Sequence, residues 1–160
     1  MEALLLLILV VTALIILALL RALVVKRRGL PYRRRDHLLT AAERSFHGVL
    51  MQAVGGRYHI AWKVRMADVL WVPGGTSNRQ RHLNRIFAKH LDFVLCHPET
   101  SAPVLAIELD DSSHRESRRR ERDSFVDAAL DAADLPLLRI PVRRSYDPRE
   151  LADLIALQFG

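Results

Sequence analysis

The chain begins with an apolar segment that is long enough to cross a lipid bilayer. Residues 3–20 contain a single polar side chain, Thr12, and apolar residues resume after Arg21. Eighteen helical residues span about 27 Å, close to the thickness of a bilayer's hydrocarbon core. No basic segment precedes the run and no small-residue cleavage site follows it, which argues against a cleaved signal peptide. We therefore predict a retained transmembrane helix over residues 1–25, with residues 3–25 in the lipid bilayer.

Basic residues are concentrated directly after this segment. Residues 1–35 hold seven basic side chains and one acidic side chain, whereas residues 36–160 hold 17 of each sign. Positively charged flanks stay on the cytoplasmic side of a membrane. We therefore predict a single-pass protein of the cytoplasmic (inner) membrane, with its N-terminus outside and its C-terminal domain in the cytoplasm. The net charge of +6 belongs to the membrane flank and is no indication that the domain binds nucleic acid.

The remainder of the chain reads as a short basic linker, residues 26–36, followed by one domain, residues 37–160. A single cysteine, Cys96, excludes a disulfide within the chain and fits a reducing compartment. The histidines at positions 82, 90 and 97 do not form, with this cysteine, the paired spacing of a structural zinc site.

Hydrophobic periodicity predicts an α/β domain. Thr40 and Glu43 form a capping box that opens an amphipathic helix ending near Val54. Alternating apolar residues predict a strand over residues 58–64. The other expected elements are an extended segment over 67–72, a basic loop with a short helix over 76–90, strands over 91–96, 104–109 and 135–142, and helices over 114–133 and 148–159. The order α-β-β-β-α-β-α indicates a central mixed sheet flanked by helices.

Acidic residues stand at the ends of two neighbouring predicted strands. Asp92 interrupts one apolar strand, and Glu108 and Asp110 end the next, on a shared face. If the two strands pair, the three carboxylates converge at one sheet edge and provide oxygen ligands of the kind Mg²⁺ or Mn²⁺ prefers. Such an ion polarises a phosphodiester and lowers the pKa of a bound water, and His114 could carry a proton.

Each of these residues also has an ordinary structural explanation. The helix cap accounts fully for Glu43, and solvated strand ends account for Glu108 and Asp110. Surface decoration accounts for His114. Asp92 is harder to explain structurally because it lies within an otherwise apolar strand, so we interpret it as functional.

A basic stripe opens the predicted helix over residues 114–133. Its members are Arg115, Arg118, Arg119 and Arg122, which lie on the side of the helix continued by Val126 and Leu130. A solvated helix start would explain these arginines. However, basic residues at a helix N-terminus oppose the macrodipole, and a bound phosphate backbone would relieve that conflict. We expect this stripe, together with Lys89, to contact nucleic acid, DNA being expected before RNA.

The segments "KHLDFVLC", "AIELDDSSH", "RRRERDSFVDAAL" and "LPLLRIP" resemble the uncharacterised family called domain of unknown function 2726. With Glu43 on the preceding helix, the pattern also resembles the PD-(D/E)xK nuclease-like, restriction-endonuclease-like core, in its branch related to very-short-patch repair endonucleases. The likeness extends from Asp36 to Phe159. It implies metal binding by Asp92 and Glu108 with a contribution from Glu43.

This chain departs from the nuclease pattern at one position. The pattern has a lysine two residues after Glu108, where this chain has Asp110. A positively charged side chain would therefore have to come from Lys63, Lys89 or another residue. The first hypothesis is a membrane-anchored, cytoplasm-facing, metal-dependent nuclease with Asp92, Glu108 and Asp110 as ligands. The alternative is a catalytically inactive relative that binds nucleic acid or a protein partner at the membrane. A structural membrane protein is a third reading.

Overall fold

The protein is described by a computed structural model covering residues 1–27, 30–110 and 117–159, and it divides into two compact units, Met1–Asp36 and His37–Gly160. The first unit holds helix α1 (Glu2–Arg27). The Thr12 hydroxyl donates to the carbonyl of Ile8 at 3.0 Å, so the polar side chain is satisfied within the helix. Among the described residues, α1 is the one helix long and apolar enough to cross a membrane, a property that a signal sequence shares.

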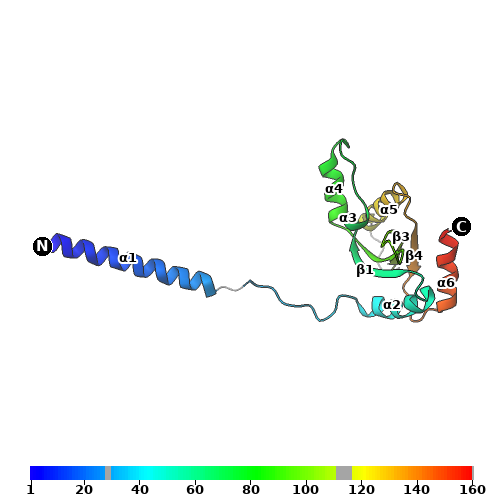
Figure 1. The fold of residues 1–160 in the computed structure, drawn as a ribbon, viewed down its shortest axis with the longest axis horizontal. Helices are drawn as coiled ribbons and strands as arrows, with labels where there is room; N and C mark the ends of the chain where they lie inside the picture. Colours follow the sequence, from blue (N-terminus) through cyan, green and yellow to red (C-terminus); the bar gives the residue numbers. More distant parts are fainter. Residues whose placement is uncertain (28–29, 111–116, 160) are drawn as a thin grey trace. The chain divides into compact units, whose positions relative to one another are not determined.

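The second unit is built on a four-stranded mixed sheet with strand order β1-β2-β3-β4 (Figure 1). Strands β1, β2 and β3 pair antiparallel in turn, and β4 runs parallel to β3. The strands are β1 (His59–Arg65), β2 (His90–Cys96), β3 (Pro103–Asp110) and β4 (Leu137–Pro141). The helices are α2 (Ala41–Val54), α3 (Met66–Val69), α4 (Arg79–Phe87), α5 (Ser117–Asp131) and α6 (Pro148–Ala156), followed by the 3₁₀ turn η1 (Leu157–Phe159).

Helices cover both faces of this sheet. On one side, which we call the α2 face, α2 and α6 pack on the sheet through a core that includes Phe46, Phe93 and Ile155. On the other side, the α5 face, helices α3, α4 and α5 enclose a second core that includes Met66 and Leu130. Figure 1 shows α2 and α5 on opposite sides of the strands. The predicted mixed α/β architecture and its element order are confirmed, with α3 and α4 inserted between β1 and β2.

The segment after β1 corrects one prediction. Residues 67–72 were expected to continue extended, but the chain leaves the sheet at Arg65 and forms the short helix α3. The amide of Met66 donates to the Lys89 carbonyl at 3.0 Å, and the side chain of Met66 is fully buried. Burial of this large side chain on the α5 face favours the turn of helix over an extended continuation.

In the middle of β1 and β2 the regular alternation of side chains is interrupted, so that residues expected on one face of the sheet lie on the other; we call this a change of face. Residues two apart on a regular strand share a face, yet Phe93 packs in the α2-face core and Leu91 in the α5-face core. The same change occurs on β1, where Ile60 packs on the α2 face and Val64 on the α5 face. Between them Lys63 has a φ of 55°, a left-handed conformation that costs a non-glycine residue about 1–2 kcal/mol. The surrounding contacts must therefore stabilise this conformation.

Truncation of the central aromatic of the α2 face tests this core. Phe46 is fully buried, and its ring centroid lies 5.3 Å from that of Phe93 and 5.1 Å from that of Tyr146. We expect Phe46→Ala to lower the free energy of unfolding by about 3–5 kcal/mol, because it removes a buried ring and leaves a cavity. The measurement is guanidinium unfolding of the full chain in detergent micelles, followed by tryptophan fluorescence. The control is Met51→Ala on the same helix, whose side chain is 52% exposed, and an equal loss in both variants would contradict this packing.

Candidate functional site

The centre of the candidate site is the amine of Lys63, which lies between two carboxylates. Its Nζ is 2.6 Å from Oε1 of Glu43 and 3.1 Å from Oδ1 of Asp92. The three residues come from β1, α2 and β2, so the amine joins two strands to the helix that covers them. The left-handed backbone of Lys63 at the change of face is part of this arrangement.

Glu43 has two roles, one for each carboxylate oxygen. Oε2 accepts the backbone amide of Thr40 at 2.8 Å, while the Thr40 hydroxyl accepts the amide of Glu43 at 3.3 Å. This reciprocal pair is the predicted capping box. Oε1 is left to accept from Lys63. The side chain of Glu43 is 11% exposed, so the helix cap fixes a nearly buried carboxylate beside the amine.

Asp92 links the amine to the third strand. Its Oδ1 accepts from Lys63, and its Oδ2 accepts the backbone amide of Leu109 at 3.0 Å. Asp92 directly precedes Phe93, which pairs with Ile107, so it lies just beyond the last paired position at this end of β2. Its carboxylate therefore replaces a strand-to-strand hydrogen bond at the end of the β2–β3 ladder. This explains how an acidic residue is accommodated within an apolar strand.

The protonation states of this group follow from opposing effects. Burial by itself raises the pKa of Glu43, but the hydrogen bonds from Lys63 and Thr40 outweigh it and hold this pKa below its ordinary value of 4.5. Burial likewise lowers the pKa of Lys63, but the hydrogen bonds that it donates to Glu43 and Asp92, together with their negative charges, raise this pKa above its ordinary value of 10.5. Near neutral pH, Glu43 is therefore a carboxylate and Lys63 an ammonium ion.

A second ionic group lies at the same end of β3, around Arg139 of β4. Its Nη1 is 3.1 Å from Oδ1 of Asp110, and its Nη2 is 2.9 Å from Oδ1 of Asp127 on α5. Glu108 is the β3 residue paired with Arg139 in the parallel register. Burial lowers the pKa of Arg139, but the hydrogen bond that it donates to Asp127 and the negative charges of Asp127, Asp110 and Glu108 outweigh this effect and raise the pKa.

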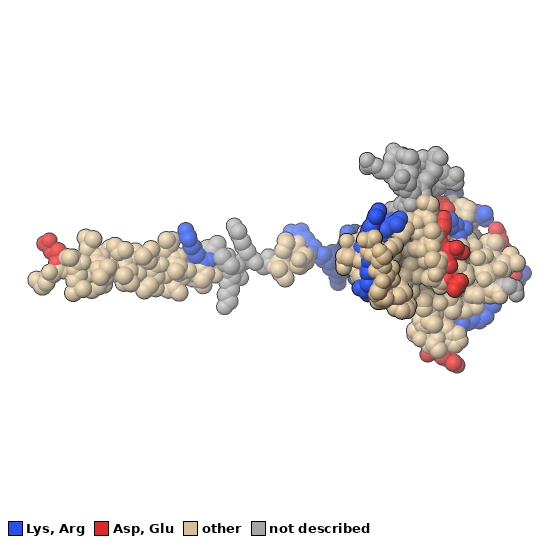
Figure 2. Space-filling model, turned by 90° about the horizontal axis from the view of Figure 1, so that it is seen from above, with Lys and Arg blue, Asp and Glu red and all other residues tan. Residues whose placement is uncertain are grey.

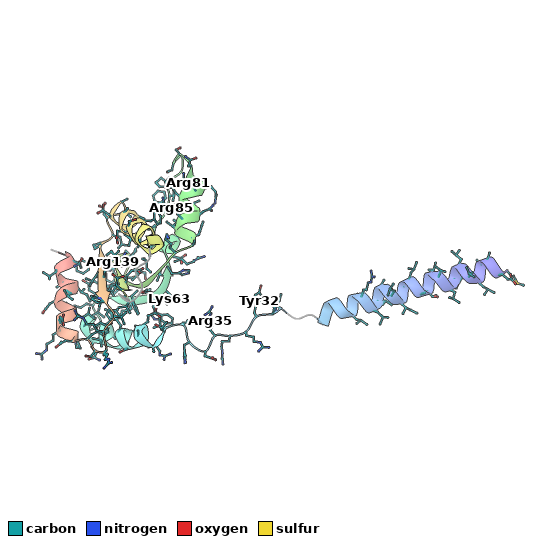
Figure 3. The ribbon with its side chains drawn as sticks, turned by 180° about the vertical axis from the view of Figure 1, so that it is seen from behind. Tyr32, Arg35, Lys63, Arg81, Arg85 and Arg139 are labelled. Carbon is teal, nitrogen blue, oxygen red and sulfur yellow. The ribbon has the colours of Figure 1, made fainter. Side chains whose placement is uncertain are left out.

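The two ionic groups lie toward different faces of the sheet. Alternation along β3 places Leu109 in the α2-face core and Ala106 in the α5-face core, so Glu108 and Asp110 belong to the α5 face. The Lys63 group includes Glu43 of α2 and belongs to the α2 face. Figure 3 labels Lys63 and Arg139, which come from the two edge strands of the sheet.

Comparison with known proteins places this fold in a family. Residues 35–158, most of the chain, match the family described as "Protein of unknown function (DUF2726)". The chain belongs to the DUF2726 family. No curated protein and no solved structure matches it.

In this DUF2726 protein the expected strand pairing is observed, but the expected group of three acids is not assembled. Strands β2 and β3 are neighbours, so Asp92 and Glu108 lie at the same end of the sheet, but Asp92 contacts Lys63 on the α2 face whereas Glu108 belongs to the α5 face. Within residues 1–27, 30–110 and 117–159, no three His, Cys, Asp or Glu side chains are gathered as a metal site. Lys63 holds Asp92, and Arg139 holds Asp110.

Several predicted site residues of the DUF2726 chain lie outside the description. His114 and Arg115 fall between the described segments. The backbone of α5 includes the positions of Arg118, Arg119 and Arg122, but their side chains are not described. Lys89 is described, and its Nζ lies 5.4 Å from the centroid of the Phe125 ring on α5.

Sequence reasoning missed Arg139 and could not choose between two lysines. Arg139 interrupts the apolar β4 segment in the same way that Asp92 interrupts β2, and that signal could have identified it. Lys63 and Lys89 were both considered as a source of positive charge. The structure places the amine of Lys63 at the acids, through a left-handed backbone that alternation does not reveal.

Removal of the Lys63 amine tests the ion group. We expect Lys63→Met to lower the free energy of unfolding by about 1–3 kcal/mol at neutral pH, because Glu43 and Asp92 then lose their shared donor. Guanidinium unfolding at several pH values measures this difference. The matched control is Arg65→Met, which removes an ion pair whose two side chains are about half exposed and which should change stability much less, because solvent screens the pair.

The same comparison has a pH dependence with a definite sign. Because the folded-state pKa of Glu43 is lowered, its contribution to stability is present above pH 4.5 and is lost as the pH falls through the lowered value. The difference between the parent protein and Lys63→Met should therefore shrink below pH 4.5. A difference that stays constant or grows there would contradict the ionic arrangement.

Proposed function

We propose that the unit His37–Gly160 is a nuclease-like domain that hydrolyses phosphodiester bonds in nucleic acid with the help of a divalent cation. The observation that carries this proposal is the ammonium group of Lys63 at 3.1 Å from Asp92, at the end of the sheet where β3 bears Glu108 and Asp110 on the opposite face. An ammonium group beside a carboxylate, at a sheet end that bears further acids, is suited to phosphoryl chemistry.

Lys63 supplies the positive charge that the nuclease pattern takes from a lysine two residues after Glu108. Asp110 stands on β3 where the pattern has lysine, but β1, on the far side of β2, brings an amine to the same end of the sheet. Its raised pKa keeps Lys63 protonated near neutral pH, so its role is electrostatic rather than that of a general base. An ammonium ion there would orient Asp92 and stabilise negative charge that develops on a phosphate.

The carboxylates are the proposed ligands for Mg²⁺ or Mn²⁺. Oxygen donors from Asp92, Glu108 and Asp110 suit these hard cations, and Glu43 would support them through Lys63. When bound, the cation would lower the pKa of a water and neutralise charge on the scissile phosphate. Loading would require Asp92 to leave Lys63 and turn toward the α5 face, where Glu108 and Asp110 lie, since no three acids among the described residues are gathered.

A catalytically inactive module is the second candidate, and a specific observation favours it. Glu43, Asp92 and Asp110 each accept a hydrogen bond from a lysine or arginine, so their charges are already neutralised. Such a domain would retain the fold and bind nucleic acid or a protein partner at the membrane without turnover.

A cleavage assay separates the two candidates. The full chain in phosphatidylcholine nanodiscs should cleave single- or double-stranded DNA or RNA when Mg²⁺ or Mn²⁺ is added, and should stop when the metal is chelated. We expect Asp92→Asn, Glu108→Gln and Lys63→Met each to lower the rate by about 100-fold or more, as loss of an electrostatic catalytic group does. Lys63→Arg should retain part of the activity because it keeps the charge.

The matched control is Glu99→Gln, an exposed acid in the turn after β2, at the opposite end of the β2–β3 ladder. This variant should cleave like the parent protein. Absence of cleavage by the parent with either metal, combined with retained nucleic-acid binding, would establish the inactive alternative and refute the enzyme.

We also propose that α1 anchors this domain at the membrane with the domain in the cytoplasm. The support is the run of basic residues after the apolar segment, which includes Arg33, Arg34 and Arg35. Protease added to membrane vesicles should digest the domain when the cytoplasmic face is outside and spare it when that face is inside. The opposite pattern would reverse the orientation, and a chain found only in the soluble fraction would identify the segment as a cleaved leader.

A further inference from the structure

A groove on the α5 face lies outside the two ionic groups. It has a volume of about 540 Å³ and runs between α5 on one side and α4 with its preceding loop on the other. Its lining includes Trp71, Arg85 and Phe125, with small side chains such as Ala129 along α5. This volume falls within the range of about 300–1,000 Å³ typical of ligand sites. Because alanine side chains are short, the α5 side of the groove leaves room for a flat group.

The aromatic side chains of the groove are placed for stacking. Trp71 is 79% exposed, although an indole buries a large apolar area when it is covered. The Cζ atom of Arg85 lies 3.8 Å from the centroid of the Phe125 ring, so the guanidinium rests on that ring. Aromatic rings and arginine planes are the surfaces on which proteins stack unpaired bases. The groove thus contains two surfaces for stacking, the exposed Trp71 indole and the Arg85 guanidinium that packs on the Phe125 ring.

The charge on the α4 side of the groove favours an anionic occupant. Residues 70–90 carry four basic side chains, from Arg79, Arg81, Arg85 and Lys89, and no acidic side chain, although residues 36–160 as a whole are balanced. Figure 3 labels Arg81 and Arg85 on α4. In the space-filling view, both basic and acidic side chains are visible on the surface of the domain (Figure 2). Positive charge clustered beside stacking surfaces matches a phosphodiester chain with unpaired bases.

The groove also lies on the face of the sheet that carries the acids of β3. Ala106 of β3 packs in the same core as Ile86 of α4 and Val126 of α5, and alternation places Glu108 and Asp110 on this face. A strand held in the groove would therefore lie on the side of the sheet where the proposed nuclease acids end β3.

We propose that this groove binds single-stranded nucleic acid, with a base stacked on Trp71 and the phosphate backbone contacted by Arg81 and Arg85. The inference rests on the proposed function and deepens it, since it names an unpaired strand as the substrate form. A folded duplex cannot place a base against the indole without unpairing it. An acidic amphipathic protein segment is the competing occupant that the test must exclude.

The test measures binding without metal, so that cleavage plays no part. Fluorescence anisotropy of a labelled oligothymidylate is recorded with the full chain in phosphatidylcholine nanodiscs containing chelator, and a duplex of equal length is the comparison. The single strand should bind more tightly. Trp71→Ala should weaken that binding about 10-fold or more, because stacking on an aromatic side chain contributes about 1–3 kcal/mol per base. Arg81→Ala should weaken it and reduce the salt dependence by about one unit of slope.

Exposed controls separate the groove from general surface effects. Leu157→Ala removes a side chain that is 74% exposed on η1, and Arg149→Ala removes an exposed arginine of α6; both should bind like the parent. In a Trp62→Phe background, Trp71 is the single tryptophan, and the oligonucleotide should quench its fluorescence. Unchanged unfolding midpoints would show that the variants are folded.

Each outcome decides the inference. Equal affinity for the single strand and the duplex, or affinity unaffected by Trp71→Ala, would overturn it. Tighter binding of a glutamate-rich amphipathic peptide than of the oligonucleotide would also overturn it and assign the groove to a protein partner. Binding that depends on Trp71 without any cleavage in Mg²⁺ or Mn²⁺ would uphold the inference while refuting the proposed nuclease.

Discussion

The ammonium group of Lys63 is the contact on which the end of the sheet depends. It satisfies a carboxylate from α2 and a carboxylate from β2, and it does so from a backbone conformation that is unfavourable for lysine. Without it, Glu43 and Asp92 would be two partly buried negative charges near each other, which would oppose packing of α2 on the sheet. The change of face in β1 and β2 thus places the Lys63 amine where it neutralises Glu43 and Asp92.

Strand β3 separates the charges of this region into two sets. The backbone of Leu109 donates to Asp92 on one side, while its neighbours Glu108 and Asp110 belong to the other face, near Arg139. Neutralisation by a different basic side chain on each face lets several acids gather at one end of the sheet without strong mutual repulsion. Any ligand that joins the two sets must first compete with those basic side chains.

Local patterns in the sequence predicted much of this fold. The capping box of Thr40 and Glu43 and the strands β1, β2 and β3 each depend on a few neighbouring residues, and each is observed. The single buried face expected for β1 is not observed, because Ile60 and Val64 pack on opposite faces of the sheet. The pairing of β2 with β3, which brings Asp92 to the end of β3, was also predicted. Alternation could not predict the left-handed residue at Lys63, because that conformation is stabilised by contacts distant in sequence. For the same reason the partnership of Arg139 with Asp110 was not apparent.

The connection between β1 and β2 has a consequence for how such a domain can diversify. These strands are hydrogen-bonded neighbours that a tight turn could join, yet residues 66–89 form two helices between them. The entropic cost of closing a loop rises only slowly with its length, so this excursion can be lengthened, shortened or recomposed while the strand register is kept. Ligand selectivity and chemistry could then evolve independently, because residues 66–89 could change the ligands that they bind while the charged strand ends stay the same.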